Sequence, residues 1–161
     1  MAVQNFQVVH DFAPGEALRG ATVAIGNFDG VHRGHKAVIA AALARGRAPG
    51  KRSAALTFEP HPRAFFNPDE PLFRLTPEAA KLRLLAATGL DGAIVLTFNA
   101  ELAKLSAEDF VQRVLVDRFA ISGAAIGFNF HFGANRAGSP DFLQAQGKQH
   151  GFTVEIGRAH V

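Results

Sequence analysis

The chain has 161 residues, close to the roughly 150 expected of one domain, and its 48% apolar and 19% charged content is typical of a globular protein. It has no cysteine, which excludes disulfide frameworks, thiolate metal sites and cysteine nucleophiles. The net charge of +3 comes from scattered Lys and Arg residues, so it favours an ordinary solvated surface over a nucleic-acid-binding face.

Short apolar runs alternate with segments whose apolar residues have helical spacing. In chain order they predict strand 22–26, helix 34–47, strand 53–58, helix 77–88, strand 92–98, helix 107–119, strand 123–127, helix 139–150 and strand 152–156. Thr76 is the predicted N-cap of the second helix, with Pro77 at its first position, and Ser106 with Asp109 resembles a capping box before the third. Strands separated by such helices imply right-handed crossovers, so we predict a three-layer α/β fold with a parallel sheet.

Ligands of parallel α/β sheets bind beyond the carboxyl ends of the strands, so the residues that follow each strand are the candidates for chemistry. The loop predicted over residues 59–75 follows the second strand and is rich in proline. A loop of this length in a compact domain is usually functional or mobile.

The first strand is followed by the sequence GNFDGVHRGH over residues 26–35. Its glycines let the backbone approach a ligand closely, and the helix start that follows favours an anion. His32 and His35 can both face that anion, where imidazole donors suit a phosphoryl group that gains charge in a transition state. A zinc site is the competing interpretation, with Asp29 or His61 as a third ligand. We rank it lower and predict no protein metal site, because the glycine pattern serves phosphates.

The His-x-Gly-His pattern after the first strand resembles that of the nucleotidyltransferase superfamily, and the longer string is similar to the FAD synthetase module of bacterial bifunctional riboflavin kinase/FAD synthetases. Further matches follow in order between residues 23 and 154. They are TFEPHP at 57–62, LT at 75–76, FN at 98–99, LSAEDFV at 105–111, GFNFHFG at 127–133 and RAG at 136–138. The first block is shared with other nucleotidyltransferases, whereas the ordered set is specific to this module.

The resemblance implies a Rossmann-like nucleotidyltransferase fold and an enzyme that transfers AMP from ATP to FMN, giving FAD and pyrophosphate with Mg²⁺. It implies that Asn27, His32 and His35 are catalytic. The expected ATP-binding residues are Gly26, Asn27, Phe28, Asp29, Gly30, His32, Gly34 and His35. No nucleophilic side chain is required, because the FMN phosphate attacks the α-phosphorus directly, and the protein positions the substrates and neutralises charge.

The resemblance also implies an FMN side of the site, made of residues that follow the second and fourth strands. The expected FMN-binding residues are His61, Pro62, Phe65, Asn129, Phe130, Phe132 and Arg136. Phe66 is a further candidate to cover the flavin ring, although either Phe could simply pack in the core. His131 occupies a position where the family commonly has Arg.

The family's second ATP motif, Ser-Ser-Thr-x-x-Arg, should follow the last strand, but the sequence has no such string. We therefore expect residues 1–155 to be an FMN adenylyltransferase domain that is incomplete at its C-terminus, and activity of this chain alone is either retained without the motif or lost. Residues 156–161, IGRAHV, look like a translated sequencing adapter, so we expect this tail to be non-native. A riboflavin kinase domain is expected in the full-length parent, and riboflavin kinase activity is not expected here.

Two other functions stay open from the sequence. One is a different nucleotidyltransferase, of the cytidylyl or pantetheine-phosphate adenylyltransferase type, and the other is a non-catalytic flavin- or nucleotide-binding module. In each case the expected partners are small molecules, ATP and FMN above all, with no nucleic acid and no membrane. No secretory signal and no apolar run of about 18 residues is visible, so a cytoplasmic location is expected.

Overall fold

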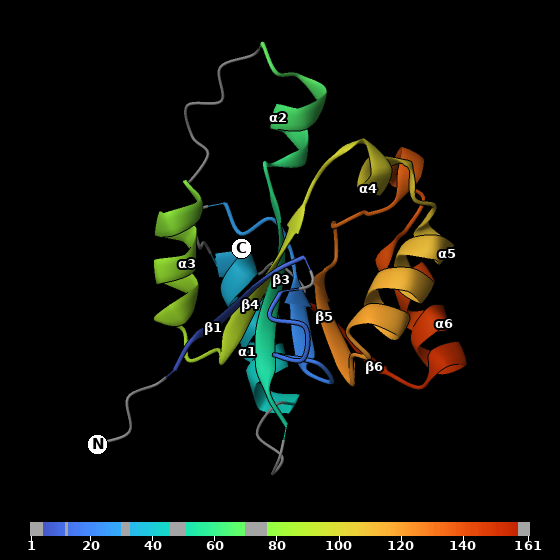
Figure 1. Ribbon diagram of the computed structural model, residues 1–161. Helices are drawn as coiled ribbons and strands as arrows, with labels where there is room; N and C mark the ends of the chain where they lie inside the picture. Colours follow the sequence, from blue (N-terminus) through green and yellow to red (C-terminus); the bar gives the residue numbers. More distant parts are fainter. Residues whose placement is uncertain (1–4, 12, 30–32, 46–50, 70–76, 158–161) are drawn as a thin grey trace.

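A computed structural model describes residues 5–11, 13–29, 33–45, 51–69 and 77–157 of the chain (Figure 1). Its strands form one sheet in the order β1-β4-β3-β2-β5-β6, and every neighbouring pair is parallel. The strands are β1 (Gln7–His10), β2 (Thr22–Ile25), β3 (Ser53–Glu59), β4 (Gly92–Thr97), β5 (Gly123–Gly127) and β6 (Thr153–Gly157).

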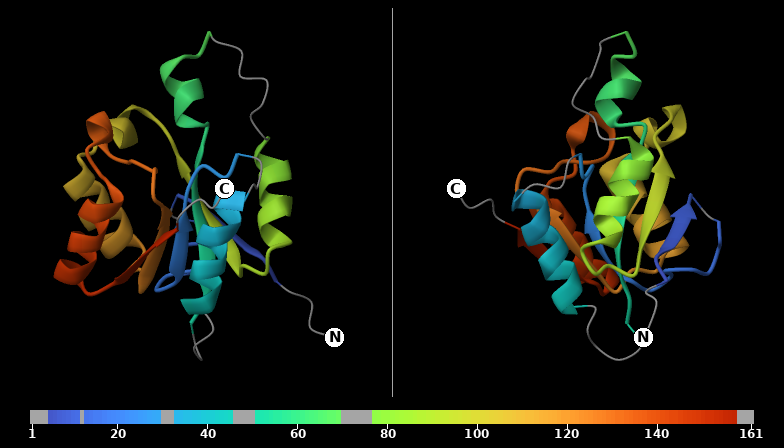
Figure 2. Two further views of the ribbon diagram at one scale, coloured as in Figure 1. Left: turned by 180° about the vertical axis from the view of Figure 1, so that it is seen from behind. Right: turned by 90° about the vertical axis from the view of Figure 1, so that its left-hand side faces the viewer.

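Helices cover both faces of this sheet. The α-helices are α1 (Arg33–Arg45), α2 (Pro62–Phe66), α3 (Glu78–Ala86), α4 (Ala100–Lys104), α5 (Ala107–Asp109) and α6 (Pro140–His150); η1 (Phe110–Arg118) is a π-helix and η2 (Ala134–Arg136) a 3₁₀ turn. Figures 1 and 2 show α1 and α3 on one face, and η1 and α6 on the other. The predicted three-layer α/β fold with a parallel sheet is confirmed.

The two faces of the sheet carry side chains of different size. On the α1 face, neighbouring strands present alanines in register; the row is Ala125, Ala24, Ala55 and Ala93. On the opposite face the next row is Ile126, Ile25, Leu56 and Ile94. Both rows are fully or almost fully buried. The small side chains let α1 pack close to the sheet, while η1 and α6 stand over a thicker aliphatic layer.

The structure adds elements that the sequence did not predict. Strand β1 lies at the sheet edge beside β4 and was missed because its apolar run is only two valines long. Helix α2 lies inside the segment 59–75 that was predicted to be loop, so that prediction is wrong over residues 62–66. Helix α4 was also missed; Asn99 caps it by accepting a hydrogen bond from the Leu102 N–H at 2.9 Å.

Two helix starts test the predicted caps. Helix α3 begins at Glu78 and Pro77 is its N-cap, so Pro77 is not at the first helical position as predicted; Thr76 lies outside the described residues. The Ser106 hydroxyl accepts a hydrogen bond from the Asp109 N–H at 3.0 Å, which is the expected half of a capping box. The predicted helix behind it is α5 continued by the π-helix η1.

Strands β2 to β5 all end at the upper edge of the sheet in Figure 1, where α2, α4 and η2 follow β3, β4 and β5. This edge therefore collects the residues that the strand rule marks as candidates. No helix in the described part of the chain is long and apolar enough to cross a bilayer.

Candidate active site

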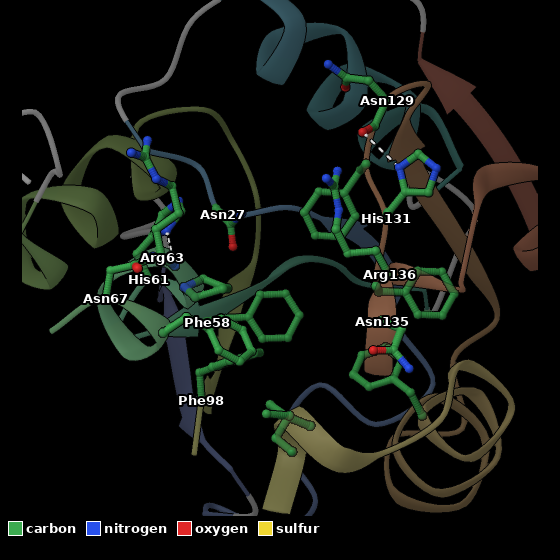
Figure 3. Close-up of a pocket in the computed structure, with 18 residues that line it drawn as sticks. Asn27, Phe58, His61, Arg63, Asn67, Phe98, Asn129, His131, Asn135 and Arg136 are labelled. Atoms are coloured by element: carbon green, nitrogen blue, oxygen red, sulfur yellow. Dashed lines mark hydrogen bonds between the residues drawn. The ribbon is translucent and has the colours of Figure 1, made fainter. Parts of the chain in front are cut away.

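A cavity of about 640 Å³ opens at the carboxyl edge of the sheet. Its walls come from the segments that follow β2, β3, β4 and β5. The lining residues are Asn27, Phe58, His61, Pro62, Arg63, Phe66, Asn67, Phe98, Leu102, Ala103, Phe110, Asn129, Phe130, His131, Phe132, Gly133, Asn135 and Arg136. Figure 3 shows Asn27, His61 and Arg63 on one side, and Asn129, His131 and Asn135 on the other.

The glycine turn after β2 is anchored by a phenylalanine that points inward. Phe28 is fully buried and lies in the cluster beneath α1, with a left-handed backbone (φ 50°). A Cβ on Gly26 would stand only 3.2 Å from this ring, so glycine leaves the space that Phe28 fills. The ring also meets His35 edge-on, with 5.2 Å between the centroids. Phe28 therefore links the turn to the first turn of α1, and its side chain is buried in the core.

Asn27 lines the cavity and offers two oxygens with different surroundings. Its backbone carbonyl accepts hydrogen bonds from Thr57 Oγ1 at 3.1 Å and from Lys81 Nζ at 3.0 Å. Its side-chain Oδ1 is buried and has no hydrogen-bond partner among the described residues. A buried acceptor without a donor carries a desolvation cost, which a ligand or ion at this position would relieve.

Lys81 is the functional candidate that the sequence analysis missed. It lies on α3, and its side chain is only 4% exposed. Its Nζ forms an ion pair with Glu59 Oε1 at 2.6 Å and donates to Thr57 Oγ1 and the Phe58 carbonyl at 3.1 and 3.3 Å. The available signal was helical spacing: Lys81 is four residues before the buried Leu85, on the same inward face.

His61 begins α2 and is held in one tautomer. Its Nδ1 accepts a hydrogen bond from the Arg63 N–H at 3.0 Å, as an N-cap, so Nδ1 is unprotonated and the ring proton lies on Nε2. Burial lowers the pKa of His61 below its usual 6.5; Lys81 and Arg63 act in the same direction, whereas Asp29 and Glu59 oppose it. His61 therefore lines the cavity as a neutral imidazole with an N–H to donate.

We expect this pKa to make stability depend on pH. As the pH falls, His61 gains a proton near pH 6.5 in the unfolded chain but only at a lower pH in the folded chain. The free energy of unfolding should therefore decrease as the pH drops below about 6.5 towards the folded pKa. The control is His61→Asn, which keeps an N-cap acceptor but does not titrate. Denaturant unfolding at about pH 7 and about pH 5 should show a larger loss for the parent chain than for the variant. Equal losses would contradict the assignment.

The opposite wall is a turn after β5 that continues into η2. Asn129 and His131 are exposed, and His131 Nδ1 lies 3.2 Å from the Asn129 carbonyl. The turn closes back on itself through the paired backbones of Phe132 and Gly138. Gly133 has a φ of 78° and packs against the backbone of Ala107 in α5. The Ala134 N–H donates to the Leu105 carbonyl at 2.7 Å. These contacts fix the wall that carries Arg136.

Aromatic rings line the floor of the cavity. Phe58 and Phe130 are nearly parallel, with an interplanar angle of 13° and 6.5 Å between centroids. Phe98 meets Phe58 edge-on at 6.1 Å and Phe65 at 5.4 Å. Phe66 is 62% exposed at the rim. These phenylalanine rings have no hydrogen-bonding groups, so the floor offers π faces and apolar area to a flat ring.

The structure thus brings together most of the predicted FMN-side residues: all except Phe65 line the cavity, and Phe65 instead packs against Phe66 and Phe98. Of the predicted ATP-side residues, Asn27 lines the cavity and His35 lies in the first turn of α1. Gly26 directly follows β2, Asp29 is half-buried in the same turn and Gly34 lies in α1. Gly30 and His32 lie outside the described residues, and the roles of the whole set remain predictions.

Within the described residues, no group of three or more His, Cys, Asp or Glu side chains could hold a metal ion. The zinc interpretation also involves His32, which the structure does not describe.

Curated relatives match the chain over most of its length. A bifunctional riboflavin kinase/FMN adenylyltransferase from Pseudomonas fluorescens is 43% identical over 153 residues, which is 95% of this chain and 48% of that protein. The protein of the same name from Escherichia coli K12 is 38% identical over 135 residues, 84% of this chain and 43% of that protein. The chain thus spans a little under half the length of these relatives.

A solved structure shares the fold. A crystal structure described as a macrolide-efflux protein from Streptococcus pneumoniae aligns with a TM-score of 0.76 at 20% identity, over 96% of this chain and 52% of that one. At this identity the likeness concerns the fold alone. A family model described as FAD synthetase matches residues 15–160. With this match over nearly the whole chain, and with relatives at 43% and 38% identity, the chain belongs to the FAD synthetase family.

Proposed function

We propose that this chain transfers AMP from ATP to FMN, forming FAD and releasing pyrophosphate. One observation supports this most directly: a single cavity collects Asn27, from the glycine turn, with His61, Asn129 and Arg136, from the segments expected to bind FMN. The cavity also has an aromatic floor and lies at the carboxyl edge of a parallel sheet, where nucleotides and flavins bind in such folds.

In the proposed reaction an oxygen of the FMN phosphate attacks the α-phosphorus of ATP. A new P–O bond forms, the bond to the pyrophosphate oxygen breaks, and pyrophosphate leaves with its electron pair. The chain's part is to align the two phosphates and to neutralise the charge that grows between them. We assign the charge stabilisation to His35, together with His32, and the alignment of FMN to the His61 N–H and to Arg136.

Mg²⁺ fits this site as an ion carried largely by the nucleotide. Asn27 Oδ1 is a buried oxygen with no hydrogen-bond partner among the described residues, and amide oxygens are ligands that Mg²⁺ accepts directly or through water. Asn27 would therefore be the residue that helps to hold it. When bound, Mg²⁺ would neutralise phosphate charge, and few protein ligands are needed for that task.

We further propose that the chain corresponds to the FMN adenylyltransferase half of a bifunctional protein. Its relatives are named for two activities, and the matched region is a little under half of each. A riboflavin kinase domain is the partner expected in the full-length parent.

The experiment that tests the function is FAD formation from FMN, ATP and Mg²⁺, followed by chromatography of the flavins. The wild-type chain should form FAD, and His35→Ala should form it at least about 100-fold more slowly, since one lost donor to a developing oxyanion costs about that much. The matched control is His150→Ala, in the last turn of α6 and not among the residues that line the cavity. This variant should match the wild type.

A folded chain that binds FMN and ATP but forms no FAD would contradict the catalytic proposal and favour a non-catalytic binding module. Binding of a cytidine nucleotide or a pantetheine phosphate in preference to FMN would favour the other nucleotidyltransferase type. His150→Ala as slow as His35→Ala would show that the loss is not specific to the site.

A further inference from the structure

We propose that Lys81 is a positioning residue of this site, which holds the turn after β2 and the end of β3 at a fixed separation. The inference rests on the proposed function for its catalytic consequence. The Lys81 side chain is buried, and Lys81 is not among the cavity's lining residues, so it acts through other groups.

The contacts of Lys81 Nζ join two segments that are far apart in sequence. In the first segment, the turn that carries the predicted ATP-side residues, Nζ donates to the Asn27 carbonyl. In the second segment, the end of the strand that leads to His61, Nζ contacts Thr57 Oγ1, the Phe58 carbonyl and the Glu59 carboxylate. One cation from α3 therefore ties the nucleotide side of the cavity to the FMN side.

Thr57 reinforces the same tie. Its hydroxyl donates to the Asn27 carbonyl and accepts from Lys81, so the Asn27 peptide oxygen is held from two directions. The residue that these two donors hold is itself one of the residues that line the cavity. Loss of the ammonium would remove a buried donor from the Phe58 carbonyl and leave the Asn27 carbonyl with the Thr57 hydroxyl alone. We expect the turn to shift so that these oxygens regain a hydrogen bond.

A simpler role for Lys81 is to neutralise Glu59, whose side chain is 23% exposed beside it. The two roles make different predictions. If charge balance is all that matters, removal of both charges should restore function. If the three neutral acceptors matter, removal of both charges should not help, because Asn27, Thr57 and Phe58 still lack the hydrogen bond that each accepts from Lys81.

The test compares Lys81→Met, Lys81→Arg and the double variant Lys81→Met with Glu59→Gln. The control is Arg83→Met, which removes an exposed cation from the same helix. Two quantities are measured: steady-state FAD formation, normalised to the stoichiometry of FMN binding so that only folded protein counts, and amide hydrogen exchange in peptides that cover residues 22–29.

We expect Lys81→Met to lower kcat by about 100-fold with each KM within about threefold of wild type, because each substrate still binds but the two are misaligned. Exchange should become faster in residues 22–29 and stay unchanged in α6. Lys81→Arg should recover part of kcat, the double variant should stay as slow as Lys81→Met, and Arg83→Met should behave as wild type.

A double variant with wild-type kcat would overturn the proposal in favour of charge balance. So would Lys81→Met with wild-type kcat, or with exchange that rises equally throughout the chain, as for a merely structural residue. If the wild type forms no FAD, the proposed function fails, and the exchange measurement alone decides whether Lys81 holds the turn.

Discussion

Replacing Phe28 by alanine is expected to lower the free energy of unfolding by about 3–5 kcal/mol, the usual cost of emptying a buried aromatic site. The ring is fully buried between the sheet and α1, so its loss leaves a cavity that the packed alanines around it cannot fill. The left-handed backbone at residue 28 is strained equally in both proteins, so this strain does not alter the comparison.

The same change should slow FAD formation even in the fraction that is folded. The His35 imidazole packs edge-on against the Phe28 ring, so removal of that ring takes away a contact that positions the imidazole. Chemical unfolding gives the stability, and the FAD assay at saturating substrates gives the rate. Phe28→Leu should lose much less stability, and Phe66→Ala, at a ring that is 62% exposed, should lose little. Equal losses of unfolding free energy for Phe28→Ala and Phe66→Ala would contradict the anchoring role of Phe28.

Replacing Gly133 by alanine is expected to cost about 2–6 kcal/mol of stability, from backbone strain and overlap together. Its backbone angles, φ 78° and ψ 171°, lie in a region that is essentially restricted to glycine. An added Cβ would also lie 2.7 Å from the N and Cα atoms of Ala107, which are backbone atoms of a helix and cannot move aside easily.

The turn that starts at Gly133 carries Arg136 on the cavity wall, so FMN should also bind at least about tenfold more weakly. Gly151→Ala is a matched control: Gly151 has φ 86° and ψ 26°, but a Cβ there meets nothing within 4 Å. It should cost only about 1–2 kcal/mol and leave FMN affinity unchanged. Thermal unfolding and FMN titration measure both effects, and a Gly133→Ala variant no weaker than Gly151→Ala would refute the overlap argument.

The sequence predicted the central sheet and much of the cavity because both follow from local pattern. Three buried strands of apolar residues are followed by the glycine turn, by His61 and by Asn129, and the parallel fold then brings those segments together. The motif was less informative about side-chain direction. Phe28 stands in the middle of the predicted ATP motif, yet its ring packs into the core, because only the backbone of such a turn would need to face a ligand.

Lys81 shows why the rest of the site was not predicted. A lysine in a helix is normally solvated, and although helical spacing places Lys81 on the inward face with Leu85, it does not show which groups Lys81 meets. Those partners come from β3 and from the turn after β2, far away in the sequence. Strand β1 was missed because it is fixed by pairing with β4. A helix was predicted where η1 lies, but not its π-helical hydrogen bonding, which leaves little trace in apolar spacing.

The alanine row beneath α1 limits which substitutions this fold can accept during evolution. On the opposite face, a larger side chain in the row that contains Leu56 can be offset by a smaller one at Ile25 or Ile94, since volume can be exchanged among neighbours. The alanine row has no such reserve: any enlargement of Ala24 or Ala55 lifts α1, and with it the start of the helix that holds His35. In a library of random variants, the aliphatic row should accept compensated pairs, whereas the alanine row should accept almost none.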